Sequence, residues 1–155
     1  MTDMSSPPPS PTPAPPYGPP IALSAAKVVL AAAEAEAEAN GWAAVIAIVD
    51  STGHLAALHR MDQSNLGAVA LSQRKAETAA KFRRPTKVYE DLVSGGAAGL
   101  RLLSVASELI ALEGGLPLIQ DGVLVGAIGV SGMQSFQDGQ VAAAGARALQ
   151  AHRAA

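Results

Sequence analysis

The chain has 155 residues, a formal net charge of −2 and no cysteine. This length fits one domain rather than two. A net charge of −2 gives no basic surface of the kind that nucleic-acid-binding proteins carry. The absence of cysteine excludes disulfides and thiolate chemistry. The longest apolar run, residues 123–130, is too short to span a membrane. The N-terminus lacks the basic start and apolar run of a secretory signal, so we expect a cytoplasmic protein.

The first 20 residues differ in composition from the rest of the chain. They contain nine of the 11 prolines. Such a segment cannot bury enough apolar surface to offset its ordering entropy. We therefore predict a disordered, proline-rich tail over residues 1–20 and a single ordered domain over residues 21–155.

The next 40 residues predict a helix and then a hairpin. Ser24 is a candidate N-cap, and Asn40-Gly41 supplies a left-handed helix end after an alanine-rich segment. The runs 42–50 and 54–62 are rich in β-forming residues, and a short turn separates them. Because the turn is tight, the two runs should pair as an antiparallel hairpin.

Helices alternate with a second hairpin in the remaining sequence. A long helix should run from about Leu66 to Phe82, and Pro85 ends it. One or two short helices follow, interrupted at residues 94–96. Residues 108–132 predict two or three strands, one ending near Leu112 and two joined by the turn Asp121-Gly122. The final helix should run from Phe136 to about His152, with Ser135 as a plausible N-cap.

This order of elements predicts the fold class. Strands joined by tight turns pair antiparallel, and helices placed between two hairpins pack on the faces of the sheet. We expect an α+β fold, with a profilin-like antiparallel sheet of about five strands flanked by helices.

The long central helix presents an unusual combination of side chains. At helical spacing, Lys75 and Thr78 share one side with Leu71, Ala79 and Phe82. A lysine centred on an apolar face is costly unless its ammonium finds a partner or a cavity. Two interpretations stay open: the lysine reaches the rim or pairs with a carboxylate, or it belongs to a ligand site.

Two glycine-containing segments and one acid are further candidates. In residues 113–117, Gly114 and Gly115 allow positive φ and the close approach of a ligand or another backbone, or simply a bend. Residues 126–132 lack the GxGxxG spacing and a surrounding βαβ unit, so a dinucleotide-binding fold is excluded. Asp138 lies on the apolar side of the last helix, where an acid at the third helical position would support the helix start.

The histidines do not predict a metal site. His54 and His59 lie five residues apart on one strand and so point to opposite faces, and His152 is near the C-terminus. None of them has metal-ligand spacing with a second ligand on a helix.

Three segments in chain order resemble one protein family. They are IVDSTGHLAALHRMD (48–62), RKAETAAKFRRPT (74–86) and EGGLPLIQDGVLVGAIGVSG (113–132), the last followed by Asp138 and an alanine-rich helix. Each segment is a weak motif, but in this order they are specific. Over about residues 23–149 the chain is identified as a member of the GlcG/HbpS family, also called haem-degrading proteins.

The resemblance implies an α+β profilin-like fold, homo-oligomers and, for some members, haem binding. The residues on its motif positions are Arg60, Asp62, Lys75, Thr78, Glu113, Gly114, Gly115 and Asp138. The implied cofactor-binding set is Arg60, Lys75, Thr78, Gly114, Gly115 and Asp138. The implied catalytic set is Lys75, Thr78 and Glu113.

Two classes of function follow from the resemblance. The first is a haem-binding protein in haem handling or redox sensing, in which Lys75 and Arg60 pair with the propionates. The second is a cofactor-free enzyme or accessory binder for a small carboxylate or catabolic intermediate, in which Lys75 acts as acid, base or anion clamp. The expected partners are haem or another small molecule and further copies of the chain, without nucleic acid or membrane.

Overall fold

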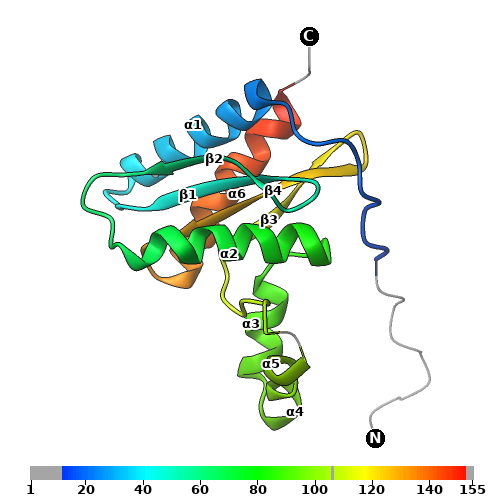
Figure 1. Cartoon of the computed structure of the whole chain (residues 1–155). Helices are drawn as coiled ribbons and strands as arrows, with labels where there is room; N and C mark the ends of the chain where they lie inside the picture. The colour runs from blue at the N-terminus through cyan, green and yellow to red at the C-terminus, as the bar shows by residue number, and fades with distance from the viewer. Residues whose placement is uncertain (1–11, 106, 153–155) are drawn as a thin grey trace, which may run out of the picture.

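The computed structural model describes residues 12–105 and 107–152. The fold is α+β, with a four-stranded antiparallel sheet in the order β2-β1-β4-β3 and helices on both faces (Figure 1). The elements are α1 (Leu23–Ala39), β1 (Val45–Asp50), β2 (Leu55–Arg60), α2 (Gly67–Phe82), α3 (Lys87–Ser94), α4 (Ala97–Leu100), α5 (Leu102–Val105), β3 (Gly115–Gln120), β4 (Val123–Ser131) and α6 (Ser135–Ala151).

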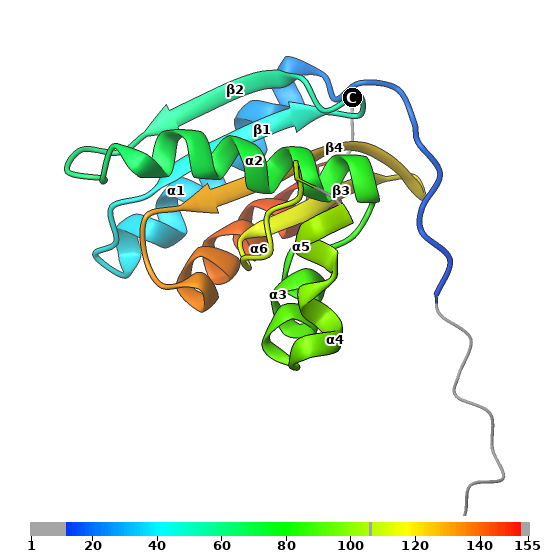
Figure 2. The ribbon, with the colours of Figure 1, turned by 60° about the horizontal axis from the view of Figure 1, so that its bottom comes forward.

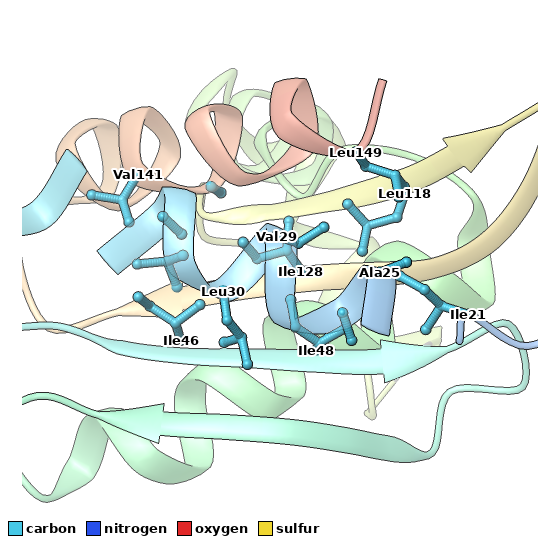
Figure 3. Close-up of a cluster of buried hydrophobic side chains, with 14 of the residues drawn as sticks. Ile21, Ala25, Val29, Leu30, Ile46, Ile48, Leu118, Ile128, Val141 and Leu149 are labelled. Atoms are coloured by element: carbon cyan, nitrogen blue, oxygen red, sulfur yellow. The ribbon is translucent and has the colours of Figure 1, made fainter. Parts of the chain in front are cut away.

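The sheet separates two apolar layers. Helices α1 and α6 pack against each other on one face, and α2 lies across the other face (Figure 2). The larger core cluster lies under α1 and α6, where Val29 and Leu30 meet Ile46, Ile48 and Ile128 from the central strands (Figure 3). Under α2 the core consists of Val49 and alanines. These small side chains let α2 lie close to the sheet.

Both predicted hairpins are confirmed. Asp121 and Gly122 have φ of 52° and 79°, the two positive values that a tight antiparallel turn of this kind requires. In the first hairpin, Gly53 has φ of 86°, and Asp50 Oδ1 accepts hydrogen bonds from the backbone N–H groups of Thr52 and His54. These local contacts explain why turn chemistry alone predicted the pairing of β1 with β2 and of β3 with β4.

Both predicted N-caps are wrong. Helix α1 begins at Leu23, so Ser24 lies inside the helix, and Ala22 caps it without a side-chain hydrogen bond. Helix α6 begins at Ser135, and a reciprocal capping box between Gln134 and Gln137 closes its first turn. Gln134 takes the N-cap position that serine or threonine usually occupies in a capping box, so the common sequence signature did not mark the right residue. The predicted left-handed end of α1 is confirmed, with φ of 71° at Gly41.

The prediction of about five strands is wrong, because the strand expected to end near Leu112 is absent from the part of the chain that the structure describes. Leu109 and Ile110 are buried in a loop instead. The Ile110 N–H donates to Thr78 Oγ1 at 3.2 Å, so a side chain satisfies the donor that a strand neighbour would have satisfied. The profilin-like arrangement stays a prediction.

The segment before α1 contacts the end of the sheet. Tyr17 forms an isolated bridge with Leu124, the Gly18 N–H donates to Leu124 O at 2.7 Å, and the Leu124 N–H donates to Pro16 O at 2.8 Å. Residues 1–11 of the predicted tail lie outside the described residues, and the mobility of residues 1–20 in solution stays a prediction. Within the described ranges, no helix is both long and apolar enough to cross a membrane.

Candidate functional site

Lys75 forms a buried ion pair with Asp138. Helix α2 lies against β4 and directs the lysine toward the end of that strand. Its Nζ donates to Asp138 Oδ2 at 3.0 Å and to the Val130 carbonyl at 2.9 Å. The side chains of Lys75 and Asp138 are only 2% and 3% exposed. The carboxylate-pairing interpretation of Lys75 is thus confirmed.

Asp138 lies in the first turn of α6, so the ion pair joins the start of α6 to α2. The third helical position is Gln137, so the interpretation of Asp138 as the third-position acid is wrong. Its Oδ1 accepts a hydrogen bond from the Met133 N–H at 3.0 Å. Burial raises the pKa of Asp138 above its ordinary value, while the Lys75 ammonium and the backbone donors act in the opposite direction.

The two glycines of the 113–117 segment let the chain pass directly over the ion pair. Gly114 has φ of 128°, and a Cβ at this position would lie 2.5 Å from Val130 O and 2.9 Å from Lys75 Nζ. A Cβ at Gly115 would collide with the Lys75 carbonyl of α2 and the side chain of Thr86. The prediction of a close backbone approach at these glycines is confirmed.

Thr86 is a member of this cluster that was not among the predicted site residues. It is fully buried, its N–H donates to Gly115 O at 3.0 Å, and its Oγ1 accepts the Gly115 N–H at 2.9 Å. The signal was present as the Pro85-Thr86 pair that ends the second family motif. Thr86 therefore ties the exit of α2 to the start of β3.

Removing the Thr86 hydroxyl should destabilise the fold. Thr86→Ala leaves the buried Gly115 N–H without its acceptor, which costs about 1–3 kcal/mol. Thr86→Ser retains the hydroxyl and should lose only about 0.8 kcal/mol for the missing methyl group. Urea denaturation of both variants measures the difference, and equal losses would show that the hydroxyl contributes nothing.

Thr78 lies on α2 three residues after Lys75, and Glu113 lies in the loop before β3, but both side chains have other contacts. The Thr78 hydroxyl accepts the Ile110 N–H and so fixes the loop before β3. Glu113 is half-buried, and its Oε1 lies so close to Gly139 that a Cβ there would collide with it. Burial raises the pKa of Glu113, with Lys87 acting in the opposite direction.

Arg60 and Asp62 lie elsewhere. Arg60 ends β2, the edge strand, and β1 separates that strand from β4 and the lysine. With Glu34, Glu38 and Trp42, both residues line a hollow of about 440 Å³. The structure thus does not bring Arg60 to Lys75. Across the described ranges, no group of three or more histidine, aspartate or glutamate side chains is placed to hold a metal ion.

The cluster joins four segments into one unit. The lysine comes from α2, its acceptors from the end of β4 and the start of α6, and the glycines from the entry to β3. A closed, neutralised pair of this kind holds backbone segments in position. It offers no exposed charge to a ligand.

The chain is similar in sequence and fold to known proteins. The family model described as "Haem degrading protein HbpS-like" matches residues 21–147. Protein GlcG of Escherichia coli strain K12 is 46% identical over 106 residues, which cover 68% of this chain and 77% of GlcG. The crystal structure of Klebsiella pneumoniae protein ORFY matches with a TM-score of 0.81 and 28% identity, covering 93% of this chain and 100% of ORFY.

A solved haem complex is also similar. The PduOC–haem complex matches with a TM-score of 0.76 and 29% identity, covering 83% of this chain and 94% of PduOC. The fold and the cluster define an α+β domain in which a buried lysine–aspartate pair lies beneath a double glycine. The chain belongs to the HbpS-like family.

Proposed function

We propose that the protein binds haem. The observation that carries the proposal is the match of 83% of the chain, at a TM-score of 0.76, to a domain solved in complex with haem. At 29% identity the similarity extends beyond the fold to part of the sequence. The downstream role, haem handling or redox sensing, stays a prediction.

The predicted cofactor-binding residues do not fit direct contact with haem. Lys75 and Asp138 are buried and neutralise each other, and a propionate would have to compete with both acceptors of the ammonium. Thr78 uses its hydroxyl within the fold, and Arg60 shares its hollow with three carboxylates, which would repel propionates. Gly114 and Gly115 are buried too. We infer that the contacts to haem come from other residues.

The alternative function is a cofactor-free enzyme or accessory binder for a small carboxylate. In such a protein Lys75 would act as acid, base or anion clamp, and Thr78 and Glu113 would orient it. The two acceptors already held by the Lys75 ammonium lower the support for this role. No contact of the described residues favours it over haem binding.

An absorbance titration of the full chain with hemin tests the proposal. We expect a saturable shift of the Soret band that ends near one haem per chain, because a specific site has a fixed capacity. A linear increase without a shift, identical to that of hemin in buffer, would contradict haem binding. Calorimetric titration of the same sample with small carboxylates tests the alternative.

We also propose that the chain forms homo-oligomers. Helices α3 to α5 project from the sheet (Figure 2), and they carry the exposed side chains of Leu92, Leu100 and Leu103. Apolar side chains grouped on a projection are typical of surfaces that another chain covers. Sedimentation velocity should show a species larger than the monomer at micromolar concentration, and a pure monomer would contradict this.

A further inference from the structure

A second hollow lies between the segment before α1 and the β3 edge of the sheet. We call it the arginine pocket; it is lined by residues 12–15 and 83–85 with Leu116, Pro117, Ile119 and Ala146. Its volume is about 450 Å³, within the range of small-molecule sites. The segment that supplies residues 12–15 runs past the end of the sheet before α1 begins (Figure 1).

The lining combines apolar walls with positive charge. Leucine, isoleucine, alanine and proline side chains supply most of its surface. Among the described lining residues the ionisable ones are Arg83 and Arg84, and none is a carboxylate. Arginine pairs with carboxylates through two parallel hydrogen bonds, so this lining suits an apolar ligand that carries carboxylates.

Arg83 is held in place before any ligand arrives. It ends α2 in the left-handed conformation, with φ of 55°. Its guanidinium lies 4.8 Å from the centre of the Tyr17 ring, and its Nη1 donates to Pro15 O at 3.1 Å. A guanidinium has five N–H donors, so the contact with Pro15 leaves others for a carboxylate. Fixing the side chain in advance lowers the entropic cost of binding.

The buried cluster holds the opposite walls of the pocket together. Residues 83–85 directly precede Thr86, and Leu116 and Pro117 directly follow Gly115. The two hydrogen bonds between Thr86 and Gly115 therefore fix the two walls relative to each other. Gly115 in turn lies against the Lys75 backbone. The family motif residues therefore fix the position of the β3 wall of the pocket relative to α2.

We propose that the arginine pocket binds an apolar ligand through its carboxylates. If the protein binds haem, as proposed above, then haem is this ligand and Arg83 and Arg84 pair with its propionates. The identification with haem rests on that proposed function. The ligand class, an apolar carboxylate, rests on the pocket itself.

Arginine variants of the full chain test the proposal. Arg83→Asn removes the charge and retains a residue that tolerates the left-handed conformation, and Arg84→Gln removes the charge of the more exposed arginine. Arg74→Gln is the matched control, because Arg74 is exposed on α2 and is not a lining residue. The probes are hemin and iron-free protoporphyrin IX, which carries the same two propionates but cannot be held through iron.

We expect each pocket variant to weaken binding of both probes by roughly tenfold or more, and Arg74→Gln to leave it unchanged. Hemin binding that is unaffected by both pocket variants would overturn the pocket while haem binding stands. Protoporphyrin binding that depends on the arginines, without hemin binding, would support the pocket and contradict the proposed function. Binding of neither probe would overturn both. If Arg83→Asn lowers the melting temperature, Arg84→Gln decides the outcome.

Discussion

Lys75→Met should lower the free energy of unfolding by about 3–5 kcal/mol at pH 7. Methionine keeps most of the apolar stem but leaves Asp138 buried without its cation. It also removes the donor to Val130 O. Urea denaturation at pH 7 measures the loss, and a loss below about 1 kcal/mol would contradict a structural role for the pair.

The pH dependence gives this prediction a second readout. Because the pKa of Asp138 is raised above its ordinary value of 3.8, the folded protein holds this proton more tightly than the unfolded chain. Stability from this group therefore falls as pH rises from about 3.8 through the raised pKa. Without Lys75 the pKa of Asp138 rises further. The loss in free energy of unfolding caused by Lys75→Met should therefore be smaller near pH 4 than at pH 7.

A double variant distinguishes the loss of the lysine charge from the cost of leaving the Asp138 carboxylate buried without a partner. Asp138→Asn keeps an oxygen for the Met133 N–H and removes the charge. Lys75→Met combined with Asp138→Asn should recover roughly 1–3 kcal/mol relative to Lys75→Met alone. No recovery would show that packing of the lysine stem, rather than its charge, explains the loss.

Gly114→Ala should also be strongly destabilising, lowering the free energy of unfolding by about 2–6 kcal/mol. An alanine there would have to adopt a φ of 128°, which costs about 1–3 kcal/mol. Its Cβ would also lie 2.5 Å from Val130 O and 2.9 Å from the Lys75 ammonium. Relieving these contacts adds about 1–3 kcal/mol, and it displaces the pair beneath.

Gly96 offers a matched control for this experiment. It has a similar φ of 118°, but a Cβ there would meet nothing within 4 Å. Gly96→Ala should therefore show only the conformational cost, roughly 2 kcal/mol less than the loss from Gly114→Ala. If Gly114→Ala and Gly96→Ala lower the stability equally in thermal unfolding, the contact with the ion pair contributes nothing.

Much of the fold could be predicted because its signals are local. The turn Asp121-Gly122 specifies a hairpin through the conformational preferences of two residues, and the left-handed end of α1 depends on Gly41 alone. The cost of placing Lys75 on an apolar helix face predicted a special environment before its partner was known. Asp138 was a candidate because it lies on the apolar side of the last helix, and Gly114 because a glycine allows a close backbone approach. The structure brings both to the lysine.

The remainder depends on contacts between distant segments. The apolar residues Leu109 and Ile110 resemble a strand in sequence, but the hydroxyl of Thr78 on α2 satisfies the Ile110 N–H and a loop results. The placement of Arg60 depends on strand order, because β1 lies between its strand and β4. The arginine pocket combines residues 12–15 with residues 68 to 134 positions further along the chain, and no local pattern marks such a site.

The most direct test is the location of the iron in crystals of the full chain grown with haem. Anomalous scattering at the iron absorption edge identifies its position independently of the surrounding protein density. We expect an anomalous peak in the arginine pocket, with the propionates on Arg83 and Arg84. A peak at any other surface, in crystals whose protein saturates with haem in solution, would contradict this assignment.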